Sequence, residues 1–305
     1  MTGAIVIDSV SKRYGSIEAL DGVSLSVERG ELYGLIGPDG AGKSSIYRIL
    51  ATLLTPDSGS ASVLGIDTVT GYRELRRLIG YMPEHFSLYQ DLTVKENLDF
   101  FATLFGVKVS DNYDLIAPVF SQLDRFPDRP AGQLSGGMKQ KLALSCALIH
   151  RPEVLLLDEP TTGVDAVSRS EFWDMLGQLR KSGITILVST SYMDEATRCD
   201  RLSMINGGRI LATGTPAALS ARLDGQLYNA VAMDMFGLLG KLRRCVGVTD
   251  CYTFGATLHA VVTPEFDPAA TQSQLRREGL TDTRIYPATP DIEDLFIRLT
   301  YDNRS

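Results

Sequence analysis

The stretch ELYGLIGPDGAGKSSIYRIL, which begins at Glu31, restricts the fold of this chain more than any other feature. An apolar run, Leu32–Ile36, leads directly into a match to G-x-x-x-x-G-K-[ST], and a helical pattern follows at once. Glycines let main-chain N–H groups curve around an anion, and a helix start adds partial positive charge beneath it. We therefore expect an α/β fold with a phosphate-binding loop made of Gly37, Pro38, Asp39, Gly40, Ala41, Gly42, Lys43, Ser44 and Ser45.

Four side chains predict a nucleoside triphosphate bound with Mg²⁺. Lys43 can bridge the β- and γ-phosphates, and the Ser44 hydroxyl can bind the metal. The apolar run in EVLLLDEP ends in Asp158 and Glu159, as a buried strand with acids at its carboxyl end would. Asp158 can hold Mg²⁺ through a water, and Glu159 can polarise the water that attacks the phosphate.

Strand and helix patterns alternate up to about residue 222, and then the pattern changes. Before that point we expect buried parallel strands at Leu32–Ile36, Val154–Leu157 and Thr185–Val188, helices at 94–105, 137–149 and 169–180, and a hairpin in RLSMINGGRILATG. After it, the predicted order is β-α-β-β-α-β, the pattern of a ferredoxin-like unit, followed by an amphipathic helix in DIEDLFIRL. The sequence therefore predicts two domains, 1–222 and a small α+β domain at 223–305.

The composition limits the classes of partner. The formal net charge of −7 argues against binding to nucleic acid or to anionic lipid. No apolar stretch approaches the roughly 18–20 residues that cross a bilayer, and the N-terminal residues lack a secretory pattern. The four cysteines have no metal-binding or redox spacing, which is typical of reduced thiols in a cytosolic protein. A role at a membrane would therefore require a membrane-embedded partner.

The segment LSGGMKQKLALSCALI, from Leu134 to Ile149, adds a second glycine-edged helix start at Ser135, Gly136 and Gly137. With this motif in place, the chain resembles the ATP-binding cassette (ABC) ATPases over about residues 3–222. The resemblance implies a P-loop NTPase cassette with a RecA-like core, an antiparallel β subdomain and an α-helical signature subdomain. It also implies that the signature residues bind the γ-phosphate of ATP held by the opposite subunit of a head-to-tail dimer.

The resemblance assigns further roles. It makes Gly37–Ser44 the Walker A loop, with Asp39 where many members have Asn, and Asp158 and Glu159 the Walker B pair. Tyr14 in KRYG is then the aromatic residue that stacks on adenine, with an ordinary strand-end tyrosine as the alternative. Asp165 in TTGVD is the residue that couples the two sites of the dimer. The segment 81–98, YMPEHFSLYQDLTVKENL, is the region that senses Mg²⁺ and touches the membrane subunits.

Two positions depart from the family pattern. Ser191 stands where the family normally has a histidine that senses the γ-phosphate, and Glu84 stands where it commonly has a glutamine that serves Mg²⁺ and the attacking water. Ser191 also fits a helix N-cap on local sequence. Both residues would act on the ATP that is bound by the Walker A and Walker B motifs of this same chain. We therefore expect slow ATP hydrolysis at that site. The retained Glu159 argues the other way. The expected metal ligands are Ser44, Asp158 and Glu84.

Three functions remain open. The favoured one is an ATP-hydrolysing motor subunit of a multidrug- or polyketide-type exporter, held at the cytoplasmic face of the membrane by a transmembrane permease subunit. The second is a mainly nucleotide-holding partner of a second complete cassette, for which a non-identical chain is favoured over a second copy. The third, a soluble ABC protein that acts on ribosomes or DNA, is opposed by the acidic charge and the single cassette. For the C-terminal domain we favour a packing or dimer-stabilising role over ligand sensing or partner selection.

Overall fold

The computed structural model describes residues 3–222 and 226–302. The chain divides into two compact units, Met1–Pro216 and Ala217–Ser305, and each is described by itself. The domain boundary expected at residues 222 and 223 stays a prediction.

A six-stranded sheet forms the centre of the first unit. Its strands lie in the order β10 (Arg209–Gly214), β9 (Arg201–Asn206), β3 (Leu32–Ile36), β8 (Thr185–Thr190), β7 (Val154–Leu157) and β6 (Ile79–Met82). All neighbours are parallel except the β9–β10 hairpin, which is antiparallel. The three predicted buried strands and the hairpin are thus confirmed. In such a sheet the carboxyl ends of the strands meet at one edge, where ligands bind.

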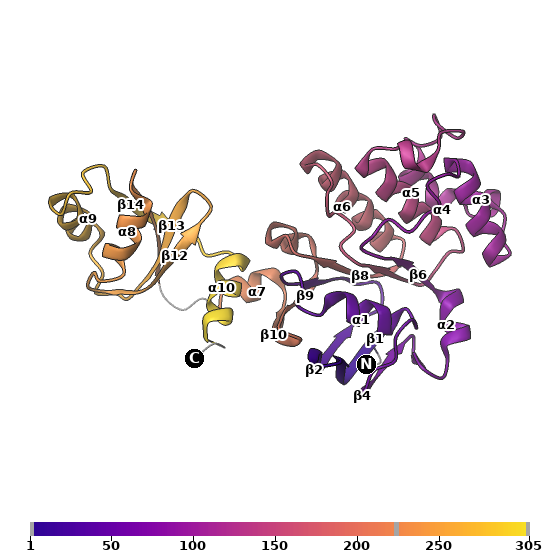
Figure 1. Cartoon of the computed structure of the whole chain (residues 1–305), viewed down its shortest axis with the longest axis horizontal. Coiled ribbons are helices and arrows are strands. Elements are labelled where there is room, and N and C mark those ends of the chain that lie inside the picture. The colour runs from indigo at the N-terminus through magenta and orange to yellow at the C-terminus, as the bar shows by residue number, and fades with distance from the viewer. Residues whose placement is uncertain (1–2, 223–225, 303–305) are drawn as a thin grey trace. The chain divides into compact units, whose positions relative to one another are not determined.

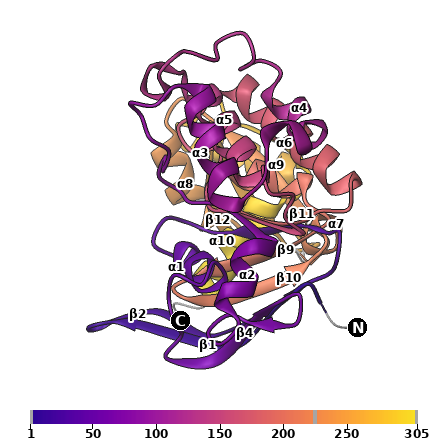
Figure 2. The same cartoon turned by 90° about the vertical axis from the view of Figure 1, so that its right-hand side faces the viewer.

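Both faces of this sheet are buried, because successive side chains of each strand enter different cores. Leu155 and Leu157 belong to one core, and Val154 and Leu156 to the other. The helices α3 (Val94–Phe105), α4 (Tyr113–Phe120), α5 (Gly136–Leu148) and α6 (Ala166–Lys181) lie on the side of the sheet that carries Leu155 and Leu157 (Figures 1 and 2). The helices predicted at 94–105, 137–149 and 169–180 are therefore confirmed.

The opposite side carries a second, antiparallel sheet in the order β2 (Ile17–Val27), β1 (Ile5–Tyr14), β4 (Ser58–Val63) and β5 (Ile66–Asp67). Helices α1 (Lys43–Leu50) and α2 (Tyr72–Leu78) lie on this side too (Figure 1). The 3-10 helices η1 (Val109–Asp111), η2 (Ala131–Gln133) and η3 (Met193–Arg198) are connecting segments, and α7 (Pro216–Ser220) follows β10.

The second unit has the predicted β-α-β-β-α-β order. Its elements are β11 (Gln226–Val231), α8 (Met235–Leu242), β12 (Val248–Phe254), β13 (Thr257–Val262), α9 (Pro268–Arg277) and β14 (Arg284–Ala288). The sheet order is β12-β13-β11-β14, with every neighbouring pair antiparallel. Side chains of α8 and α9 pack on one face of this sheet, and Ile297 of α10 (Ile292–Asp302) packs on the other.

The described parts of the chain contain no helix that is both long and apolar enough to span a lipid bilayer. The four cysteines are buried and form no disulfide.

Candidate nucleotide-binding site

Two glycines of the phosphate loop are required by its close contacts. A Cβ on Gly37 would lie 2.1 Å from the carbonyl oxygen of Ile205, and a Cβ on Gly42 would lie 2.4 Å from that of Ala19. Gly42 also has φ of 104°, a conformation that residues with a side chain rarely adopt. Because Gly42 directly precedes α1, the first N–H groups of the helix face the loop without a side-chain cap. The loop is therefore built to admit an anion.

Lys43 is held inside this loop. Its side chain is buried, and Nζ donates to the carbonyl oxygens of Gly37 at 2.5 Å and Pro38 at 2.9 Å. The same Nζ lies 2.9 Å from Oε1 of Glu159, so the two charges form a buried ion pair. The ammonium group thus donates to two main-chain oxygens and faces the Glu159 carboxylate as an ion pair.

Glu159 comes from the turn after β7, and three further contacts fix it. Its Oε2 accepts from the Thr162 hydroxyl at 3.0 Å and from the Ser191 main-chain N–H at 3.2 Å. Its own N–H donates to Ser189 Oγ at 2.9 Å. The backbone of Glu159 is left-handed, with φ of 50°, a strained conformation that persists only where the surroundings hold it.

Asp158 lies one residue earlier and is also buried. It accepts from the Ser189 hydroxyl at 2.9 Å, so one serine ties together both acids of the strand end. Burial raises the pKa of the Asp158 carboxyl above its ordinary value; hydrogen bonds from Ser189 and Ser44 oppose this, and the charges of Glu84 and Glu159 add to it. The Ser44 hydroxyl also lies 3.4 Å from Oε2 of Glu84. A hydroxyl and two carboxylates therefore come together at the start of α1.

These groups border a cavity of about 310 Å³. Most of the predicted phosphate-binding residues line it, together with both glutamates; the lining is Ala19, Asp39, Gly40, Ala41, Gly42, Lys43, Ser44, Ser45, Glu84 and Glu159. Tyr14 is partly exposed and its hydroxyl lies 3.3 Å from Ser45 Oγ, so an aromatic ring stands beside this loop. The exposed Asp39 places a negative charge at the edge of the cavity.

The prediction that Ser191 caps a helix is wrong. The residues that follow it form the short 3-10 helix η3, which begins at Met193 and has no side-chain cap. The turn is made instead by Thr190, whose Oγ1 accepts from the Tyr192 N–H at 3.0 Å. Ser191 contributes its main-chain N–H to Glu159.

No histidine takes the place of the missing one. The three histidines lie elsewhere in the described structure: His85 is exposed, His150 donates to the carbonyl oxygen of Ile79, and His259 lies in the second unit against Asp294. The contacts of Glu159 are therefore with a lysine, a hydroxyl and main-chain N–H, without an imidazole.

The predicted signature residues lie apart from this cavity. Ser135 is the N-cap of α5 and accepts from the Met138 N–H, and Ser135 and Gly136 are exposed. Gly137 packs so closely on α6 that a Cβ would lie 2.8 Å from Ser168 Oγ. Asp165 is the N-cap of α6, accepting from two N–H groups at 3.1 and 3.0 Å. The structure thus leaves the start of α5 open to another molecule.

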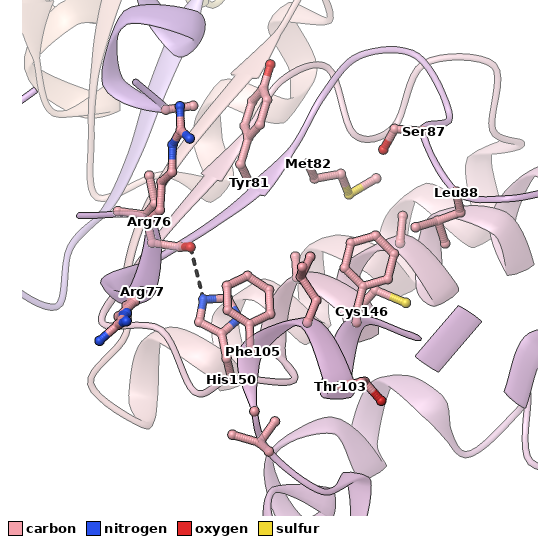
Figure 3. Close-up of a pocket in the computed structure, with 18 of the residues that line it drawn as sticks. Arg76, Arg77, Tyr81, Met82, Ser87, Leu88, Thr103, Phe105, Cys146 and His150 are labelled. Atoms are coloured by element: carbon pink, nitrogen blue, oxygen red, sulfur yellow. Dashed lines mark hydrogen bonds between the residues drawn. The ribbon is translucent and has the colours of Figure 1, made fainter. Parts of the chain in front are cut away.

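A larger cavity, of about 1050 Å³, lies between α2, α3 and the end of α5 (Figure 3). Its floor is apolar, and Phe105 stacks on His150 with ring centroids 3.8 Å apart. Arg73, Arg76 and Arg77 of α2 line it, and in the described residues none of the three has a carboxylate within ion-pair distance. This groove therefore has an apolar surface beside three arginines that form no ion pair in the described residues.

Sequence reasoning missed Ser189 and Thr162 as site residues. The run Ser189-Thr190-Ser191 was visible as three hydroxyls at a strand end, but only contacts across the sheet edge reveal that Ser189 bridges Asp158 and Glu159. Thr162 lies three residues after Glu159, and Pro160 lies between them, a spacing that is typical of a turn. Such a turn would bring the Thr162 side chain next to Glu159.

Comparison with known proteins gives consistent results. A model of the ABC transporter family matches residues 20–162. The probable multidrug ABC transporter ATP-binding protein YbhF of Escherichia coli is 39% identical over 302 residues, with 97% of this chain and 52% of that protein covered, so the chain spans about half of its length. The Nod factor export ATP-binding protein I of Sinorhizobium fredii is 38% identical, over 97% of this chain and 86% of that protein. A daunorubicin resistance ATP-binding protein of Streptomyces coeruleorubidus is 36% identical, over 99% and 97%.

Solved structures give the same fold. The ATP-binding subunit of an ABC transporter has a TM-score of 0.65 at 29% identity and covers 72% of this chain and 92% of its own. A dimeric ATP-binding cassette in a post-hydrolysis state, bound to ADP and phosphate, has a TM-score of 0.63 at 27% identity and covers 69% and 98%.

Proposed function

The chain belongs to the ATP-binding proteins of the ABC transporter family, and on that basis we propose that it is an ATP-hydrolysing motor subunit of a membrane exporter. The observation that carries this proposal is the buried contact between Lys43 of the phosphate loop and Glu159 at the end of β7, beside a cavity lined by the loop. The names of the relatives, which refer to multidrug transport, Nod factor export and daunorubicin resistance, favour export over import.

ATP would bind with its phosphates in the loop and its base beside Tyr14. The N–H groups of the loop and of the α1 start would hold the β-phosphate, and Lys43 would turn from Glu159 to the γ-phosphate. Stacking of adenine on an exposed aromatic ring contributes about 1–3 kcal/mol. The position of the Tyr14 ring, next to Ser45, supports this assignment.

The residues around Ser44 fit Mg²⁺. This ion prefers oxygen ligands and keeps several waters, and the Ser44 hydroxyl with the carboxylates of Asp158 and Glu84 offers oxygens alone. When bound, Mg²⁺ neutralises charge on the phosphates. A carboxylate at position 84 binds the ion by charge, but it cannot donate a hydrogen bond to water as an amide would.

Hydrolysis would use Glu159 as general base. The carboxylate accepts a proton from a water whose oxygen forms a bond to the γ-phosphorus, while the bond from that phosphorus to the bridging oxygen of ADP breaks. ADP and phosphate are the products. Glu159 lies beside Lys43. Because Lys43 would bind the γ-phosphate, the general base would lie close to the phosphorus atom that the water attacks.

We expect this site to turn over slowly. A γ-phosphate-binding imidazole is replaced by Ser191, whose N–H is already engaged by Glu159. Loss of one oriented donor costs roughly 10²–10³ in rate. The start of α5, which would act on the partner's ATP, is exposed and retains Ser135, Gly136 and Gly137. This asymmetry favours a head-to-tail dimer with a non-identical, complete cassette. It also supports a second candidate function, in which this chain mainly holds ATP as part of the dimer contact.

The membrane partner would bind the groove beneath α2. An apolar floor with three uncompensated arginines at α2 suits an amphipathic segment that carries acidic residues. We therefore propose a transmembrane permease subunit as occupant, which would hold this chain at the cytoplasmic face of the membrane. The second unit would serve as a packing or dimer-stabilising part.

Turnover of the purified chain, with and without Ser191→His, tests this function. We expect slow hydrolysis by the native chain and an increase of up to about 100-fold in Ser191→His. The variant Glu159→Gln should abolish turnover in both. If the native chain hydrolyses ATP fast and histidine adds nothing, the slow-site proposal is wrong. If neither form hydrolyses ATP but both bind it, the nucleotide-holding function is the correct one.

A further inference from the structure

The turn after β7 connects Glu159 to Thr162. Pro160 occupies its second position, and the Thr162 N–H donates to the Glu159 carbonyl oxygen at 3.2 Å, which closes the turn. As a result, the two ends of the turn lie side by side, and the Thr162 hydroxyl donates to the Glu159 carboxylate at 3.0 Å.

This hydrogen bond distinguishes the two carboxylate oxygens. Oε2 accepts from Thr162 and from the Ser191 N–H, whereas Oε1 faces Lys43. A carboxylate with both donors on one oxygen cannot rotate without breaking them. The other oxygen is therefore presented in a fixed direction, toward the cavity that the phosphate loop lines.

We infer that Thr162 is a positioning residue for the general base: its hydroxyl holds Oε2, so that Oε1 alone meets the attacking water. The inference rests on the proposed role of Glu159. Thr162 itself is an exposed residue in the loop before α6, so its side chain is not needed for the core. The other donor to Oε2 is main-chain, which no substitution at position 191 short of proline removes.

A misplaced catalytic group can lower the rate about a hundredfold. We expect Thr162→Val, which keeps the shape and removes the hydroxyl, to lower kcat about 10- to 100-fold with KM changed less than about threefold. Thr162→Ser, which restores the hydroxyl, should recover most of kcat. The affinity for ADP, measured by calorimetry, should stay close to the native value in both variants, because neither substitution removes the Glu159 charge that competes with phosphate for Lys43.

Thr197→Val is the matched control, since this exposed threonine donates to the Asp194 carbonyl oxygen, away from Glu159. It should leave kcat unchanged. All variants are measured in the native and the Ser191→His backgrounds, so that a slow site still gives a measurable rate.

The outcomes separate this inference from the proposed function. Turnover that is equal in native chain and Thr162→Val overturns the inference and leaves the proposed function standing. A loss of kcat that Thr162→Ser does not recover also overturns it, because the hydroxyl is then not the cause. Absence of turnover in both backgrounds refutes the general base role of Glu159, and the inference with it.

Discussion

Lys43 and Glu159 form a buried ion pair, with Nζ 2.9 Å from Oε1 and each side chain about 5% exposed or less. A phosphate must therefore compete with a carboxylate for the same lysine. We predict that Glu159→Gln binds ADP about tenfold more tightly than the native chain, because the substitution removes both this competition and a negative charge beside the phosphates. ADP cannot be hydrolysed at this site, so the effect is separate from trapping of ATP. Calorimetric titration with ADP measures it; unchanged or weaker binding would refute it.

The raised pKa of Asp158 predicts how metal-dependent binding responds to pH. A raised pKa means that the carboxyl gains its proton, and loses its capacity to bind Mg²⁺, at a higher pH than an ordinary aspartate. Glu84→Gln removes one of the charges that raise it. The pH at which the Mg²⁺-dependent part of ATP affinity is half lost should therefore move downward in this variant. ATP titrations with and without Mg²⁺, from about pH 4, near the ordinary pKa of aspartate, up to about pH 8, test this.

Glu74→Gln provides the control for that series. Glu74 is an exposed acid on α2 and does not line the nucleotide cavity. Its substitution should not change the pH at which the Mg²⁺-dependent part of the ATP affinity is half lost. An upward movement in Glu84→Gln, or an equal movement in both variants, would contradict the prediction.

A buried network in the second unit predicts an acid-sensitive contact. His259 Nδ1 lies 2.5 Å from Asp294 Oδ1, to which the Tyr252 hydroxyl donates at 2.9 Å. Burial raises the pKa of Asp294, but hydrogen bonds from His259, the Asp291 N–H and Tyr252 outweigh it, so the pKa is below its ordinary value. A lowered pKa contributes stability that is complete above the unfolded-state pKa, near 4, and is lost as the pH falls through the folded-state pKa.

Asp294→Asn should therefore reduce the hydrogen-exchange protection of β13 and α10 at pH 7, by about tenfold or more. The difference between native and variant chains should shrink in acid, as the native carboxyl takes up its proton. Exchange measured by mass spectrometry at matched pH reports both. Glu265→Gln, at an exposed loop position of the same unit, should not alter protection. A difference that does not depend on pH would show that charge is not the cause.

The charge of the large groove predicts a specific loss of membrane association. Reversal of Arg73, Arg76 and Arg77 to glutamate should lower the fraction of the chain that sediments with membranes of the producing organism by about tenfold. ATP affinity should not change. A control with the same change in net charge reverses three exposed cations elsewhere on the cassette, Arg29, Lys181 and Arg209. If the control lowers sedimentation equally, the effect is one of net charge and the groove has no specific role.

The sequence alone determined the cassette and the position of its phosphate loop. Gly37 and Gly42 stand where a Cβ would collide with main-chain carbonyls, and Lys43 follows in the first turn of α1. The conformation of the loop itself therefore requires these residues, and the motif can be recognised from the sequence. The alternation of strands and helices was readable for the same reason, since the apolar periods are set by the elements themselves.

The tertiary structure alone decided what the residues at the sheet edge do. Ser191 looked like a helix cap, yet Thr190 makes that turn and Ser191 offers its N–H to Glu159 from 32 positions away. Ser189 bridges two acids that follow the end of a neighbouring strand, which no local pattern encodes. The physical reason is that parallel strands bring their carboxyl ends together only when the sheet forms. Contacts between such ends depend on strand order, and strand order is a property of the whole fold.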